Sequence, residues 1–166
     1  MKKDNFIIFL DIDGVLNNYN YWYECAKRHN NKKLMNCQNF PFDPKCLENL
    51  MKLYQKIEEK YTPQIVLTST WRLSMVDTAI VNSRLAEYGM EIINKTDDLG
   101  GCRDNEIENF LLKLKLNNTS YANYLILDDN IWGFKQKFDD RNIIETNAQT
   151  GFNNEKLEEA IEKIDG

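Results

Sequence analysis

A short and wholly apolar run, residues 6–10, ends abruptly at the acidic sequence Asp11-Ile12-Asp13-Gly14. Because no position in the run is polar, it predicts a strand covered on both faces, like the central strand of a parallel sheet. The run is far shorter than the roughly 20 residues that a membrane-spanning helix requires. This feature therefore favours an α/β architecture with two carboxylates at the carboxyl end of its central strand, where ligands of open parallel sheets bind.

Short apolar runs alternate with longer stretches of helical periodicity along the chain, which is typical of a parallel α/β fold. Further strands are expected at residues 65–67, 92–93, 124–127 and 143–144. Helices are expected after the Asp43-Pro44 cap, at about residues 75–88, from about Asp104, and after Asn153 or Asn154. With 166 residues, 42% hydrophobic and 28% charged, the chain is expected to form one domain, residues 1–166, around a mainly parallel sheet of about five strands.

Residues 17–42 interrupt this alternation. A strand-to-helix connection needs only about 2–6 residues, so the segment is expected to be an insertion that forms a small lid. It contains aromatic residues, among them Trp22 and Tyr23, and basic residues, among them Lys32 and Lys33. Such side chains could stack on a base and hold a phosphodiester backbone. The alternative is that Trp22 and the tyrosines pack the lid while the lysines are solvated.

The cysteine pattern and the net charge argue against several classes of function. None of the four cysteines forms a C-x-x-C pair, so thioredoxin-like redox chemistry has no support. Cys25, His29, Cys37 and Cys46 could supply zinc ligands, but their spacing matches no common zinc module, and reduced thiols are the simpler expectation. The net charge of −5 argues against a dedicated nucleic-acid binder without excluding a local basic patch. With no signal peptide or membrane span in view, a cytoplasmic location is expected.

Candidate site residues follow three of the apolar runs. Asp11 and Asp13 can face one small volume, and such clustered carboxylates repel each other unless a hard cation such as Mg²⁺ neutralises them. A second carboxylate pair, Asp128-Asp129, follows the run at residues 125–127. Thr68 follows the run at residues 65–67, and hydroxyls and backbone amides at such a turn suit phosphate oxygens. The sequence therefore predicts a phosphate and metal site at one edge of the sheet.

These motifs resemble those of the haloacid dehalogenase (HAD) superfamily of phosphotransferases. D-I-D-G-V-L is similar to its first motif, I-V-L-T to its second and L-I-L-D-D to its fourth. More narrowly, S-T-W-R, R-D-N-E-I-E-N-F-L and T-N-A-Q-T-G-F resemble small bacterial and phage HAD domains, including domains of nucleic-acid repair proteins. The resemblance implies a three-layer Rossmann-like fold with a small cap-like insertion after the first strand.

The resemblance also implies roles for the four aspartates. Asp11 would be the nucleophile that forms an aspartyl-phosphate. Asp13 would protonate the leaving alcohol and then activate water. Asp11 and Asp128 would bind Mg²⁺ through their side chains and Asp13 through its backbone carbonyl, with Asp129 as a lesser ligand or acting through a metal-bound water.

The phosphate-binding groups depart from the family pattern at one place. Thr68, helped by Ser69, would bind phosphoryl oxygens. Where the family usually has a lysine, this chain has Arg103, whose guanidinium can also neutralise a phosphate and bind it through two hydrogen bonds. Lys95 is a second candidate for that role. Arg72 could also face the phosphate, or form a salt bridge on the helix surface.

The expected function is Mg²⁺-dependent hydrolysis of a phosphomonoester. A nucleotide or a nucleic-acid terminal phosphate is the expected substrate, with a small phosphorylated metabolite as the second candidate. A phosphoprotein phosphatase and a non-catalytic binding module on the same fold are the alternatives. No membrane association and no obligate protein partner are indicated.

Overall fold

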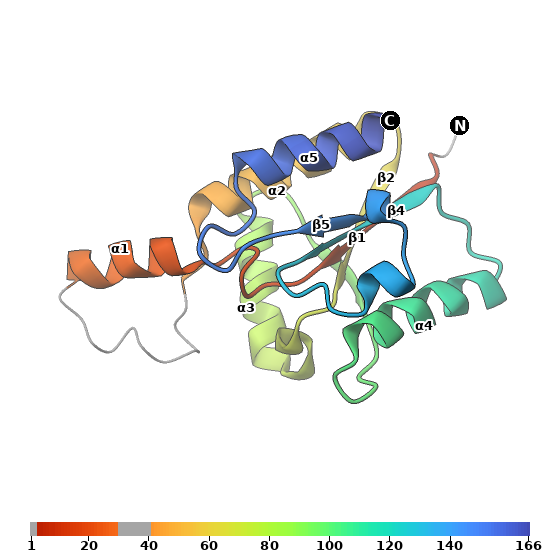
Figure 1. Ribbon diagram of the computed structural model, residues 1–166, viewed down its shortest axis with the longest axis horizontal. Coiled ribbons are helices and arrows are strands. Elements are labelled where there is room, and N and C mark those ends of the chain that lie inside the picture. The colour runs from red at the N-terminus through yellow and green to blue at the C-terminus, as the bar shows by residue number, and fades with distance from the viewer. Residues whose placement is uncertain (1–2, 30–40) are drawn as a thin grey trace.

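The computed structural model describes residues 3–29 and 41–166, and these form an all-parallel, five-stranded sheet in the order β3-β2-β1-β4-β5 (Figure 1). The strands are β1 (Asn5–Leu10), β2 (Thr62–Leu67), β3 (Ile92–Lys95), β4 (Asn123–Asp128) and β5 (Ile143–Glu145). The central position of β1, which its continuous apolar run predicts, is confirmed. Its residues 6–10 are at most 1% exposed.

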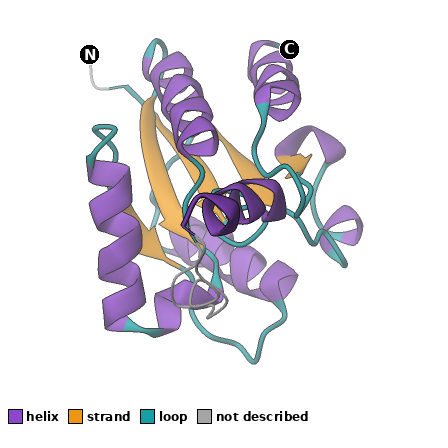
Figure 2. Ribbon diagram, turned by 90° about the vertical axis from the view of Figure 1, so that its left-hand side faces the viewer, coloured by secondary structure: helices purple, strands orange, loops and turns teal. Residues whose placement is uncertain are grey.

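Helices cover both faces of this sheet, giving three layers (Figure 2). Phe6, Ile8 and Leu10 of β1 pack in one core with α2 (Pro44–Glu58), α3 (Met75–Ala86) and α5 (Asn154–Asp165). Ile7 and Phe9 point to the other face, into a core shared with α4 (Arg103–Leu116) and the short helix η4 (Phe134–Gln136). The three-layer Rossmann-like fold that the sequence predicts is therefore observed.

Local signals in the sequence set several helix boundaries. The Asp43 carboxylate accepts a hydrogen bond from the Lys45 N–H at the start of α2, directly before Pro44. Asn153 caps α5 in the same way, through the N–H of Lys156. Ser69 begins the short helix η3 (Thr70–Leu73), and a further short helix, η5 (Asp140–Asn142), precedes β5. None of the helices in the described ranges is long and apolar enough to cross a bilayer.

In the described part of the insertion expected at residues 17–42, the helix α1 (Tyr19–His29) lies beyond the carboxyl ends of the strands (Figure 1). Lys32, Lys33 and Cys37 lie outside the described residues. Of the candidate zinc ligands, Cys46 is buried in α2, where its Sγ contacts the Thr150 carbonyl at 3.7 Å. Cys25, Cys46 and Cys102 are free, in line with the expected reduced thiols, and the zinc alternative stays untested because Cys37 is not described.

Candidate active site

The hydrogen bonds of the sheet continue past the strand ends and align the site residues. The Asp11 N–H donates to the Leu127 carbonyl at 3.0 Å, and the Thr68 N–H donates to the Leu10 carbonyl at 2.9 Å. Asp128 is the last residue of β4, the neighbour of β1 on its other side. Because adjacent parallel strands end at one edge, Asp11, Thr68 and Asp128 lie side by side there.

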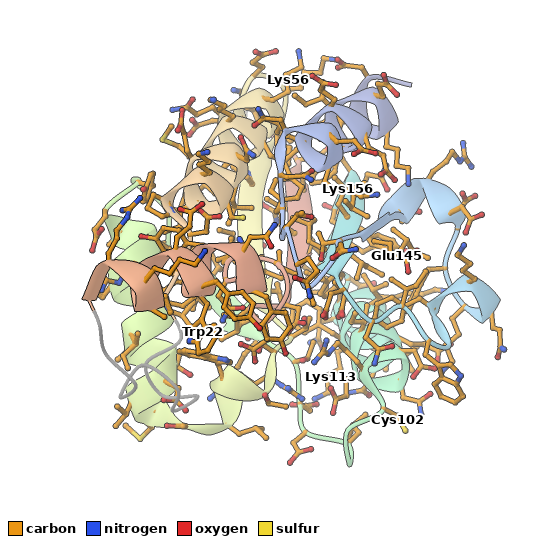
Figure 3. The ribbon with its side chains drawn as sticks, turned by 60° about the vertical axis from the view of Figure 1, so that its left-hand side comes forward. Trp22, Lys56, Cys102, Lys113, Glu145 and Lys156 are labelled. Carbon is orange, nitrogen blue, oxygen red and sulfur yellow. The ribbon has the colours of Figure 1, made fainter. Side chains whose placement is uncertain are left out.

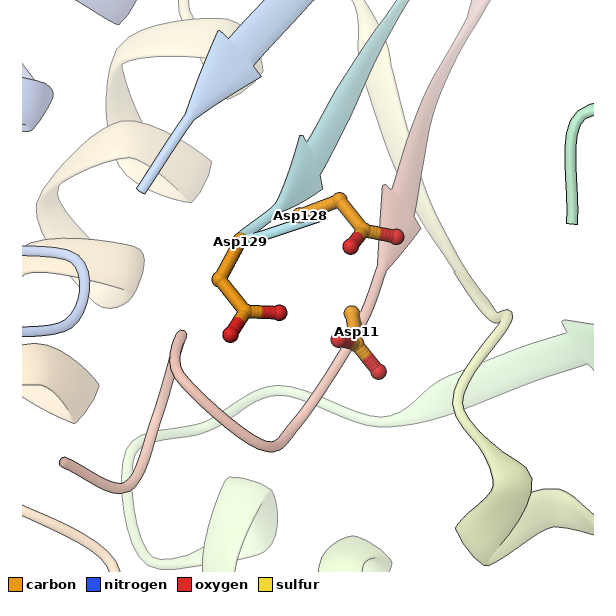
Figure 4. Close-up of side chains that lie close together, drawn as sticks. All are labelled: Asp11, Asp128 and Asp129. Carbon is orange, nitrogen blue, oxygen red and sulfur yellow. The ribbon is translucent and has the colours of Figure 1, made fainter. Parts of the chain in front are cut away.

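Three carboxylates converge at this edge (Figure 4). Asp11, Asp128 and Asp129 each offer an oxygen within 4.8 Å of the others. Burial raises the pKa of Asp11 to about 7; the charge of Asp128 adds to the effect and Arg103 opposes it. Burial also raises the pKa values of Asp128 and Asp129. Carboxylate oxygens are the ligands that Mg²⁺ prefers, and the repulsion within this cluster is what a divalent cation relieves, so these residues fit a magnesium ion.

Arg103, the first residue of α4, bridges two members of the carboxylate cluster. Its Nη1 lies 3.0 Å from an Asp11 oxygen and 2.6 Å from an Asp128 oxygen. Lys95, the other candidate for this position, donates instead to the backbone carbonyl of Arg72 at 3.2 Å. Arg103 is thus the candidate that the structure brings to Asp11, and its guanidinium has further N–H donors that could bind a phosphoryl group.

Gly14 is required by the close approach of Asp129. Its φ of +75° is unfavourable for other residues, and a Cβ at this position would lie 2.3 Å from an Asp129 oxygen. The buried hydroxyl of Thr146 donates to the Gly14 carbonyl at 2.7 Å and fixes the turn. The glycine in the first motif therefore allows the chain to turn directly after Asp13, in close contact with Asp129.

The Asp13 carboxylate is held by two N–H donors. Its Oδ1 accepts from Asn17 Nδ2 at 2.7 Å, and its Oδ2 accepts from the indole Nε1 of Trp71 at 3.1 Å. Asn17 also accepts from the N–H of Gly14 at 3.0 Å. Sequence reasoning gave no role to Asn17 or Trp71. Trp71 lies inside the recognised S-T-W-R motif, but no local pattern connects it with Asp13.

Thr68 and Ser69 differ in the state of their hydroxyls. Thr68 Oγ1 is buried and has no hydrogen-bond partner within residues 3–29 and 41–166. Ser69 Oγ accepts from the N–H of Trp71 at 3.5 Å and caps η3. A buried hydroxyl without a partner is costly, so Thr68 is suited to donate to a phosphoryl oxygen at this edge.

Arg72 was expected on the surface or facing the phosphate, and the surface alternative is wrong. Its side chain is buried and pairs with Glu106 of α4 at 2.7 Å. The guanidinium also donates to four backbone carbonyls, those of Thr68, Ser69, Thr96 and Asp97. A buried charge requires such partners. Through these contacts, Arg72 holds the turn that carries Thr68 against α4.

Two clefts meet at Asp13 and Asp129, which line both. The cleft of about 350 Å³ is also lined by Asp11 and Arg103, and we call it the Arg103 cleft. The cleft of about 320 Å³ is also lined by Asn17, Asn18, Tyr19, Trp71 and Ala148, and we call it the tryptophan cleft.

Neither lining includes the lid candidates Trp22 and Tyr23 of α1. Trp22, labelled in Figure 3, is half-buried, and its ring packs edge-on against that of Tyr23 with centroids 4.9 Å apart. Their predicted contact with a substrate stays a prediction.

Comparison with models of known protein families gives a match over most of the chain. A family model described as "HAD domain in Swiss Army Knife RNA repair proteins" matches residues 7–157. Comparisons with curated proteins and with solved structures gave no significant match.

Proposed function

The chain belongs to the family of HAD domains in Swiss Army Knife RNA repair proteins, and we propose that it is a Mg²⁺-dependent phosphomonoester hydrolase acting through an aspartyl-phosphate. Family membership suggests a phosphoesterase role, and the Mg²⁺ dependence and the covalent intermediate are our proposal. The observation that carries it is the placement of Asp11 beside both Asp128 and the cationic Arg103. The Thr68 hydroxyl, which has no hydrogen-bond partner among the described residues, lies at the same edge of the sheet, after the neighbouring strand.

The proposed reaction has two steps. An Asp11 oxygen attacks phosphorus while Arg103 and Thr68 donate hydrogen bonds to the phosphoryl oxygens, and the ester P–O bond breaks. Asp13 gives a proton to the departing alcohol oxygen. It then takes a proton from the water that attacks the aspartyl-phosphate, which releases phosphate and regenerates Asp11.

A Mg²⁺ ion held by Asp11, Asp128 and the Asp13 carbonyl, with Asp129 as a lesser ligand, would supply positive charge that keeps Asp11 ionised. Asn17 and Trp71 orient the Asp13 carboxylate through their hydrogen bonds. A pure binding module would have no use for a second aspartate held in this way beside the first.

We infer that the substrate is a nucleic-acid terminal phosphate or a nucleotide. The RNA repair proteins named in the family description support this class. So do the aromatic side chains of Tyr19 and Trp71, which line a cleft beside Asp13, because aromatic rings stack on bases of any sequence.

A phosphatase screen tests this proposal. The panel contains RNA and DNA oligonucleotides phosphorylated at the 3′ or 5′ end, nucleotides, sugar phosphates and phosphopeptides, each assayed with Mg²⁺ and with EDTA. We expect metal-dependent phosphate release that is fastest on nucleic-acid ends or nucleotides. Fastest turnover of phosphopeptides would instead indicate a phosphoprotein phosphatase.

The Asp11→Asn variant tests the nucleophile. The amide is nearly isosteric with the carboxylate but is a far weaker nucleophile, so turnover should be abolished while the fold is kept. A purified variant that retains a tenth of the wild-type kcat would exclude Asp11 from this role.

A further inference from the structure

We propose that the tryptophan cleft binds the leaving group of the substrate, and that this group carries an uncharged planar ring, such as the base of the terminal nucleotide, which stacks on Trp71. This inference rests on the proposed function and adds to it the site, orientation and chemical class of the leaving group.

The position of Asp13 between the two clefts gives the orientation. The Arg103 cleft is lined by the proposed nucleophile Asp11 and by Arg103, so the phosphoryl group belongs there. The leaving oxygen must lie within hydrogen-bonding reach of the proton donor. Both groups that hold the Asp13 carboxylate, Asn17 and Trp71, line the tryptophan cleft. The remainder of the leaving group therefore continues past Asp13 into that cleft.

The residues that line the tryptophan cleft indicate which leaving groups it can bind, by their charge and polarity. Among the described residues that line it, Asp13 and Asp129 are acidic and none is basic. A second phosphate or a carboxylate on the leaving group would therefore be repelled. The remaining lining consists of the rings of Tyr19 and Trp71, two asparagines, Gly14 and Ala148. This lining suits an uncharged ring with polar edges.

The size of the cleft limits how much of the substrate it can hold. Its volume of about 320 Å³ lies at the lower end of the range of ligand pockets, which is about 300–1,000 Å³. This matches a single terminal residue rather than several nucleotides. A longer nucleic acid would have to leave the cleft after its last base.

Trp71 is fixed before any substrate binds. Phe42 packs against the indole with ring centroids 5.5 Å apart, and the indole N–H is bonded to Asp13. A ring that is already ordered loses little conformational entropy on stacking. The same side chain thus orients the proton donor and supplies the stacking surface, and these two roles can be separated by mutation.

The kinetic experiment compares two variants on two substrates, adenosine monophosphate and ribose 5-phosphate, which differ in the base. Trp71→Leu removes both the ring and the N–H, and should raise KM for the nucleotide roughly 5- to 150-fold while changing KM for the sugar phosphate less than about twofold. Trp71→Phe keeps a ring but loses the N–H, so kcat should fall on both substrates while KM for the nucleotide stays within about threefold. An equal KM change on both substrates with Trp71→Leu would overturn the proposal.

A binding experiment tests the same contact without turnover. Adenosine monophosphate is titrated into Asp11→Asn protein while tryptophan fluorescence is followed, with Trp71→Phe or Trp22→Phe added to the same background. We expect quenching that is lost with Trp71→Phe and kept with Trp22→Phe. Quenching that is lost with Trp22→Phe instead would assign the base to the lid on α1 and overturn the proposal.

The two experiments also distinguish failure of this inference from failure of the proposed function. If the wild-type protein hydrolyses neither substrate with Mg²⁺ present, the proposed phosphatase activity on nucleotides and sugar phosphates is wrong. The fluorescence titration then still decides whether the tryptophan cleft binds a base. If both substrates are hydrolysed with the same KM, the activity stands and the leaving-group site is excluded.

Discussion

Arg72 and Glu106 form an ion pair at 2.7 Å with side chains only 3% and 2% exposed, and it ties the turn after β2 to α4. On one side, Arg72 binds the carbonyl of Thr68 at 2.8 Å. On the other side, Glu106 lies one helical turn after Arg103 and accepts the N–H of Leu99 at 3.0 Å. The pair therefore connects the two segments that carry the proposed phosphate-binding groups, without itself contacting the carboxylate cluster.

Breaking this pair should cost much more stability than breaking an exposed one. Arg72→Met leaves Glu106 as a buried charge without its partner and should lower the free energy of unfolding by about 3–5 kcal/mol, measured by urea denaturation. Arg84 and Glu87 provide the control, because their ion pair of similar length, 2.9 Å, is about half exposed. Arg84→Met should cost less than about 1 kcal/mol. Equal losses in the two variants would show that the buried pair has no special role.

Two threonines, Thr68 and Thr96, have buried hydroxyls that are unpartnered among the described residues, and they should respond differently to loss of the hydroxyl. Thr68→Val and Thr96→Val both remove a hydroxyl that has no partner in the described part of the chain, so neither should destabilise the fold by more than about 1 kcal/mol. Thr68→Val should lower kcat/KM by about 10²-fold or more, since a donor to the phosphoryl group is lost. Thr96→Val should keep wild-type kinetics. Full activity in Thr68→Val would exclude this hydroxyl from phosphate binding.

A pair of glycines separates backbone strain from steric conflict at the site. Gly14 and Gly89 have φ values of +75° and +73°, but only a Cβ at Gly14 would collide with a neighbour, Asp129. Both alanine variants should lose about 1 kcal/mol through backbone strain. Gly14→Ala should in addition displace Asp129 and abolish phosphatase activity. Activity assays with thermal melts of both proteins measure the difference, and an active Gly14→Ala variant would contradict the geometry.

Magnesium should stabilise the folded protein through the carboxylate cluster. A ligand at a hundredfold excess over its Kd contributes about 2.7 kcal/mol, which corresponds to a rise in Tm of roughly 5–10 °C for a domain of this size. Asp128→Ala should remove most of this rise, whereas Asp4→Ala, a change at an exposed position far from the cluster, should keep it. A wild-type Tm that does not change between EDTA and saturating Mg²⁺ would count against the metal site.

Cys46 should stay protonated and unreactive in the native protein. Burial, followed by the nearby charge of Asp43, raises the pKa of its thiol from 9.0 to about 12. Since the folded pKa is the higher one, the contribution to stability is full below pH 9 and is lost as the pH rises from about 9 to 12. The Tm should therefore fall more steeply between pH 9 and 12 in the wild-type protein than in Cys46→Ala.

Thiol labelling checks the same property of Cys46 directly. At pH 8, mass spectrometry should find Cys102, which is exposed, alkylated well before Cys46. Rapid native labelling of Cys46 would show that its thiol is accessible and ionised.

Local patterns in the sequence were sufficient to predict the strands and the positions of the candidate site residues. An apolar run as short as residues 6–10 favours a buried strand over a helix, and the residue after it then lies at the sheet edge. The same holds for Thr68 and Asp128, each placed by the run that precedes it. These predictions depend on backbone hydrogen bonding and burial, which neighbouring residues determine.

The roles of Arg72 and Trp71 were decided only by the tertiary structure. Trp71 reaches Asp13 across 58 residues of sequence, and Arg72 turns inward because Glu106 and four carbonyls meet it there. Within the turn itself, nothing distinguishes an arginine that faces solvent from one that enters the core. The sequence by itself determined which residues lie at the edge of the sheet. Which of their side chains contact one another depended on the packing of α4 and η3, because the direction of a side chain is settled by the partners that offset its desolvation.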